Sequence, residues 1–98
     1  MEKIKHIVGD TVTLEINVSN ISDNIDTKLY LYKTYSSDGM KNLIKIIPPT
    51  KIDKDNNTIT FVYNTDDFLK GPTTYYGHFV LNNNGIIMNN YYRIRATF

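Results

Sequence analysis

The sequence feature that most constrains the fold is an alternation of apolar and polar residues with a period of two. It is clearest in Thr11–Val18, where every second residue is apolar. Side chains on one face of a β-strand recur at every second residue, whereas those on one helix face recur about every 3.6 residues. The segment is therefore predicted to be a half-buried strand whose core-facing residues are Val12, Leu14, Ile16 and Val18.

Six further segments have strand character and are separated by turn sequences. They are Lys3–Val8, Lys28–Thr34, Asn42–Ile47, Thr58–Tyr63, Thr74–Leu81 and a long closing strand that ends at Phe98. The clearest turn is Asn82-Asn83-Asn84-Gly85, because Asn and Gly tolerate positive φ. The composition agrees, since 29 of the 98 residues are β-branched and Ala96 is the only alanine. Such a composition argues strongly against a helix bundle.

Seven strands without an intervening helix predict an all-β protein. The expected architecture is an immunoglobulin-like antiparallel β-sandwich of about seven strands, forming one domain over residues 1–98. A small barrel is the competing architecture. The segment Leu69–Tyr75 favours the sandwich, because a leucine, a glycine turn and a tyrosine commonly build the corner before the sixth strand.

Composition also limits the function. The chain has no cysteine, which excludes disulfides, thiolate metal sites and a cysteine nucleophile. Its formal net charge is +1, so it lacks the strongly basic character of a nucleic-acid binder, and no specific nucleic-acid partner is expected. No apolar run is long enough for a signal peptide or a membrane span. We expect a protein that stays in a cytoplasm and does not enter a membrane.

The residues needed for catalysis are sparse. The only histidines are His6 and His78, and the four serines all lie in predicted loops. No serine has the sequence context of an activated nucleophile. We therefore expect no catalytic residue, no cofactor and no enzymatic activity, and an enzyme or inhibitor remains only a remote alternative.

One acidic segment deserves a test as a calcium site. Asp53, Asp55 and Asn57 match the first three oxygen positions of a calcium loop, but Thr58 and Asn64 stand where glycine and a bidentate glutamate are required. Side chains that cap a tight turn explain the segment better. No metal site is predicted, although the aspartate-rich loops leave weak calcium binding open.

One group of residues is left over once the core has been assigned. If the strand at Lys28–Thr34 neighbours the last two strands, alternation places seven side chains together on the outer face of that sheet: Tyr30, Tyr32, Tyr76, His78, Tyr91, Arg93 and Arg95. Tyr and Arg are enriched at protein interfaces. The alternative is that Tyr simply suits an exposed strand. An AT-rich genome, whose codons favour Tyr, would then account for the number of tyrosines. A functional face could contact another subunit, stack on a sugar or, least of all, bind a single-stranded nucleic acid.

Four stretches carry a resemblance to a known family: GDTVTLEINV at Gly9–Val18, KLYLYK at Lys28–Lys33, the segment Thr58–Gly85 and the closing YYRIRATF. Together they resemble small immunoglobulin-like domains of bacteriophage virion proteins. The chain is similar to the N-terminal domain of phage baseplate upper proteins, although Asn89-Asn90 stands near a position where those domains usually have glycine. The resemblance implies an assembly role and carries over no functional residue.

These observations lead to two hypotheses of different classes. The first is a non-enzymatic structural or accessory protein of a phage virion, in the capsid, a head fibre, the tail or the baseplate. Its partners would be other virion proteins or copies of itself within a larger assembly. The second is a carbohydrate-binding or adhesin-type module that uses its surface tyrosines to bind a glycan.

Overall fold

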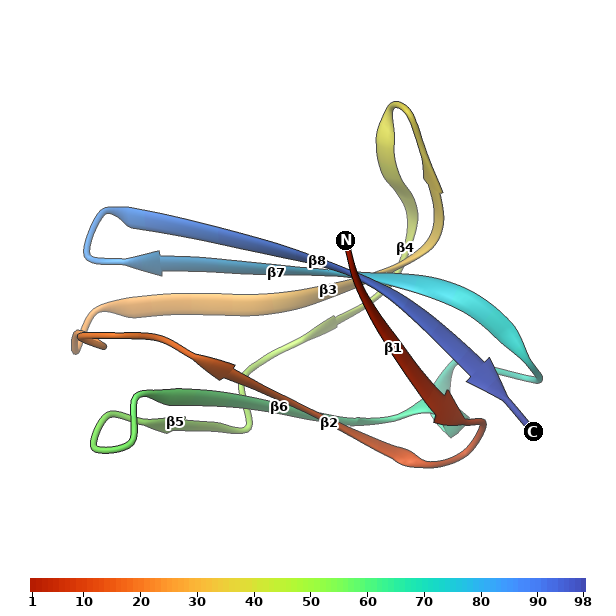
Figure 1. The fold of residues 1–98 in the computed structure, drawn as a ribbon, viewed down its shortest axis with the longest axis horizontal. Coiled ribbons are helices and arrows are strands. Elements are labelled where there is room, and N and C mark those ends of the chain that lie inside the picture. The colour runs from red at the N-terminus through yellow and green to blue at the C-terminus, as the bar shows by residue number, and fades with distance from the viewer.

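Two β-sheets packed face to face form the fold of the computed structural model, which describes residues 1–98 (Figure 1). The larger sheet has the order β1 (Glu2–Ile7), β8 (Ile86–Thr97), β7 (Thr73–Asn83), β3 (Ile25–Ser36) and β4 (Gly39–Ile47). The smaller sheet has the order β2 (Thr11–Asn17), β6 (Thr58–Asn64) and β5 (Lys51–Asp53). One 3-10 turn, η1 (Thr65–Asp67), follows β6. No helix in the structure has the length and hydrophobicity needed to cross a membrane.

This arrangement confirms the predicted immunoglobulin-like sandwich. The strands β2, β6 and β5 occupy the places of the B, E and D strands, while β3, β4, β7 and β8 take those of C, C′, F and G. Two details differ from the expectation. β1 runs parallel to β8, so the larger sheet is mixed. β5 is an eighth strand, and its three residues are too few to show an alternating pattern.

The core lies between the sheets and follows the predicted alternation. Leu29 of β3, Phe61 of β6 and Phe79 of β7 have no solvent-exposed surface. The rings of Phe61 and Phe79 meet edge to face across the sheets, with centroids 5.8 Å apart. This geometry is favourable for aromatic pairs, and it joins the middle strand of the small sheet to the larger one.

The predicted hairpin between the last two strands is also confirmed. Asn84 and Gly85 form a two-residue turn in which both have positive φ, 53° and 89°. This is the turn whose twist matches the right-handed twist of two antiparallel strands. The Asn82 side chain accepts a hydrogen bond from the Gly85 amide and closes the turn.

A chain of polar side chains crosses one end of the sandwich. Tyr75, the tyrosine of the predicted corner, is only 1% exposed. Its hydroxyl lies 2.9 Å from the hydroxyl of Tyr63 and 2.7 Å from Nε2 of His6. Burial raises the pKa of Tyr63 to about 12, and it raises the pKa of Tyr75 as well. These bonds satisfy the phenol groups and link β1 and β7 of the larger sheet to β6 of the smaller one.

The raised pKa values predict a loss of stability in alkali. In the unfolded chain tyrosine ionises near pH ~10, so above this pH the unfolded state releases protons that folded Tyr63 and Tyr75 retain. The free energy of unfolding should therefore fall as the pH rises from about 10 towards 12. Urea denaturation at several pH values in this window measures the slope. The control is the Tyr63→Phe/Tyr75→Phe variant, whose slope should be shallower, and identical slopes would contradict the prediction.

Candidate docking face

The strand register brings the seven predicted residues onto the outer face of the larger sheet. β3, β7 and β8 are neighbours, as the prediction required. Tyr30 lies opposite His78 and Tyr32 opposite Tyr76 on β3 and β7. On β8, Tyr91 lies opposite His78 and Arg93 opposite Tyr76. Arg95 follows on the same face, opposite Thr74. We call the set of seven the candidate face: Tyr30, Tyr32, Tyr76, His78, Tyr91, Arg93 and Arg95.

Three rings of the candidate face form a row across the strands. The imidazole of His78 stacks on the ring of Tyr91 with centroids 4.5 Å apart and planes 9° from parallel. On its other side, His78 lies 6.3 Å from Tyr30 at a tilt of 38°. His78 Nε2 is also 2.8 Å from Oδ1 of Asn89. The row is therefore held in place, while 43% of Tyr91 remains exposed.

The β3–β4 hairpin adds large side chains that the sequence pattern did not reveal. Pairing between β3 and β7 ends at Tyr32 and Tyr76, and beyond this point the hairpin rises from the sheet on the side away from the small sheet (Figure 1). A register shift after Leu31 and a positive φ of 61° at Asn42 bend it there. Tyr35 thereby comes to lie 5.6 Å from Tyr76, between ring centroids.

Exposed aliphatic side chains continue the face onto β4. Leu43 lies opposite Tyr32 and Ile46 opposite Tyr30, and they are 49% and 45% exposed. Alternation along β4 is enough to predict that Ile46 faces outwards. It does not predict the orientation of Leu43, because the register shift lies between the two residues. The outer face therefore offers more apolar surface than the tyrosines alone.

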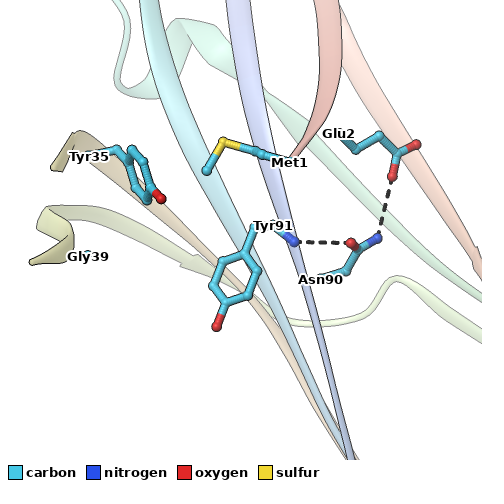
Figure 2. A pocket seen from close by; sticks show the side chains of 6 residues that line it. All are labelled: Met1, Glu2, Tyr35, Gly39, Asn90 and Tyr91. Atoms are coloured by element: carbon cyan, nitrogen blue, oxygen red, sulfur yellow. Dashed lines mark hydrogen bonds between the residues drawn. The ribbon is translucent and has the colours of Figure 1, made fainter. Parts of the chain in front are cut away.

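A hollow of about 450 Å³ opens between the hairpin tip and the start of β1 (Figure 2). Tyr35 and Gly39 line it from the hairpin, Met1 and Glu2 from the N-terminal end, and Asn90 and Tyr91 from β8. In Figure 2, Met1 reaches towards Tyr35, and the Asn90 amide bridges to the Glu2 carboxylate. The hollow thus combines two aromatic rings with an amide and a carboxylate.

The parallel pairing of β1 with β8 places two lysines beside the predicted arginines. Lys3 lies opposite Arg93 and Lys5 opposite Arg95, and all four side chains are exposed. No sequence signal identified Lys3 and Lys5 as part of this face, because the alternation within a short first strand does not say which strand it pairs with. We call these four residues the basic cluster.

Two residue groups tested for chemistry have structural roles. The Asp53 carboxylate accepts hydrogen bonds from the backbone and side-chain amides of Asn56, which lower its pKa. This is the turn capping that the sequence predicted. His6 bonds to the Tyr75 hydroxyl and lies 2.9 Å from the Ile7 carbonyl, while His78 bonds to Asn89. Both histidines therefore contact neutral groups.

Comparison with known proteins adds little to this description. No family model matches the chain, and no curated protein is significantly similar to it. One similar solved structure is an uncharacterized protein from Bacillus anthracis str. Ames. The two chains share 22% sequence identity, with 99% of this chain and 77% of the other covered, and a TM-score of 0.48. A likeness this distant carries no functional argument.

The stacked pair predicts a measurable coupling on the outer face. In a double-mutant cycle of His78→Ala and Tyr91→Ala, the free energies of unfolding should be non-additive by about 0.5–1.5 kcal/mol, the usual range for an aromatic pair. Urea denaturation of the four proteins at a pH where histidine is neutral measures the coupling. A matched cycle of Tyr32→Ala with Tyr91→Ala joins side chains on non-adjacent strands and should be additive. Coupling of equal size in both cycles would contradict a specific stack.

Proposed function

We propose that this chain is a non-enzymatic docking domain of a phage particle, and that it binds a neighbouring protein of the assembly through the outer face of its larger sheet. The proposal extends the candidate face to include Tyr35, Leu43 and Ile46. The assignment to a phage particle rests on the resemblance of the strand and turn motifs to virion domains. The docking role rests on the residues of the face itself.

The observation that carries the proposal is the exposure of large apolar side chains on one fixed surface. Tyr35, Leu43, Ile46 and Tyr91 are between 43% and 52% exposed, and all belong to the outer face or the hairpin above it. Clustered exposed apolar groups mark interaction sites more often than scattered ones. Tyr and Arg are the side chains that most often dominate binding energy at interfaces, and they are abundant here.

The rigidity of the face favours binding further. Ring stacking and the Asn89 contact hold His78 and Tyr91, so little side-chain freedom is lost when a partner binds. The outward side of the opposite sheet is more polar: β2 carries Thr11, Thr13, Glu15 and Asn17 there, although Val62 of β6 is 37% exposed beside them. A partner that needs apolar anchors would therefore select the larger sheet.

Photo-crosslinking in the assembled particle tests the proposal. A photoreactive phenylalanine analogue at Tyr91 should crosslink to a neighbouring virion protein or to a second copy, because that side chain lies in the proposed interface. The control places the same analogue at Thr13, which is exposed on β2 and should give no crosslink. The adducts are identified by mass spectrometry of purified particles. Absence of the chain from the particles, or equal crosslinking from both positions, would refute the proposal.

A carbohydrate-binding module is a second candidate, favoured by the hollow beside Tyr35 and Tyr91. Its volume of about 450 Å³ lies within the ~300–1,000 Å³ typical of small-ligand sites. A glycan array tests this role on the isolated protein. If the role is correct, a bound glycan should be lost in the Tyr35→Ala/Tyr91→Ala variant and retained in Tyr30→Ala, which lies outside the hollow. An array without signal, or equal loss in both variants, would exclude the hollow as a sugar site.

A further inference from the structure

The basic cluster has a charge arrangement that the free protein does not balance. Lys3 faces Arg93 and Lys5 faces Arg95 across the parallel ladder, so two like-charged pairs sit side by side. Like charges directly opposite each other destabilise a sheet. The four ion pairs of the protein all lie elsewhere, at Lys41, Lys45, Lys51 and Lys54. None of them brings a carboxylate to the basic cluster.

The small net charge conceals an uneven distribution of charge between the two sheets. Seven of the ten acidic residues lie on the smaller sheet, in the loops that join it, or in η1: Asp10, Glu15, Asp23, Asp53, Asp55, Asp66 and Asp67. The cations of β1 and β8 are on the opposite sheet. The protein therefore presents a localised positive surface although its formal net charge is only +1.

Protection of a sheet edge does not explain the cluster. Lysines on an edge strand discourage unwanted pairing between sheets, and this would account for Lys3 and Lys5 on β1. Arg93 and Arg95, however, lie on β8 where that strand is paired on both sides, with β1 and with β7. They protect no edge. Their position beside two lysines therefore needs another explanation. A bound anion would provide one, because it would offset the repulsion between the four cations.

We propose that the basic cluster docks an extended acidic segment of the partner protein. The inference rests on the docking function proposed above and adds the chemistry of the partner. Alternate residues on a strand are about 6.6–6.8 Å apart on the same face, so carboxylates at alternate positions of an extended segment match the spacing from Arg93 to Arg95 and from Lys3 to Lys5. Guanidinium groups hold carboxylates in a two-bond fork.

The surroundings of the cluster favour a polypeptide over a nucleic acid. Lys3 and Arg93 border a second hollow of about 270 Å³ together with Met1, Tyr35 and Tyr76, so the charges continue into the apolar part of the candidate face. A partner with apolar anchors next to an acidic segment would use both. Nucleic-acid binders are usually strongly basic over the domain, whereas this chain has a formal net charge of only +1 and places four of its eleven Lys and Arg residues in the cluster.

Charge reversal separates a binding role from a structural one. Lys5→Glu turns a like-charged pair into an opposite pair, so the free protein should become more stable, with an unfolding midpoint higher by roughly 1–5 °C. The same variant should bind an acidic probe at least about tenfold more weakly than the wild type, since a charge in the interface is reversed. Lys28→Glu on β3 is the matched control, with the same change in net charge away from the cluster.

The probe is a synthetic twelve-residue peptide of alternating glutamate and serine, with an alternating lysine and serine peptide as its counterpart. Titrations followed by amide NMR shifts should show saturable binding of the acidic peptide at β1 and β8, lost in Lys5→Glu and Arg95→Glu and unchanged in Lys28→Glu. No saturable binding, or equal loss in Lys28→Glu, would overturn the proposal. Tighter binding of a twelve-nucleotide deoxythymidine strand at the same residues would also overturn it, in favour of a nucleic-acid site.

The two proposals can fail separately. If Tyr91 crosslinks in particles but no variant of the basic cluster changes peptide binding, the docking function stands and the acidic segment is refuted. If the peptide binds as expected but Tyr91 gives no specific crosslink, the anion site exists without the proposed docking role. The cluster would then bind acidic peptides, but the docking partner proposed for it would be refuted.

Discussion

The packing of Phe61 against Phe79 is the interaction on which the rest of the structure depends. The two rings come from the middle strand of the small sheet and from β7 of the larger one, and both are fully buried. Because side chains alternate along a strand, directing Phe79 inwards also directs its neighbours His78 and Val80 outwards. The cross-sheet contact therefore sets the orientation of β7, and the ladders to β3 and β8 extend it to the whole candidate face.

The same constraint explains why the outer face can specialise. The core is complete without Tyr30, His78 or Tyr91, so these residues can be chosen for the surface that they present. Their stacking gives a rigid row, and the bent β3–β4 hairpin adds Tyr35 beside it. A rigid aromatic surface loses little conformational entropy on binding, which suits the docking role that we propose.

Prediction from the sequence succeeded where local alternation determines the structure. The inward set of β2 and the Asn84-Gly85 turn follow from residues close in the chain. Alternation also gave the outward residues of β3, β7 and β8, which form the candidate face because these strands are neighbours. Prediction missed Lys3 and Lys5 as neighbours of Arg93 and Arg95, because these pairs are 90 residues apart and a six-residue strand carries no mark of its partner. It also missed Tyr35, whose place depends on the bend in the hairpin.

The sequence by itself determined an all-β chain, the face to which most side chains point, and the absence of cysteine chemistry. The physical reason is that the alternation of a strand is local and survives whatever the strand pairs with. Only the tertiary structure decided that β1 joins β8 in parallel, that the hairpin rises above the sheet, and that four cations gather without a carboxylate among them. The β1–β8 pairing and the cation cluster depend on contacts between distant segments, and the local pattern does not distinguish one strand partner from another. The rise of the hairpin depends on a register shift that interrupts the alternation.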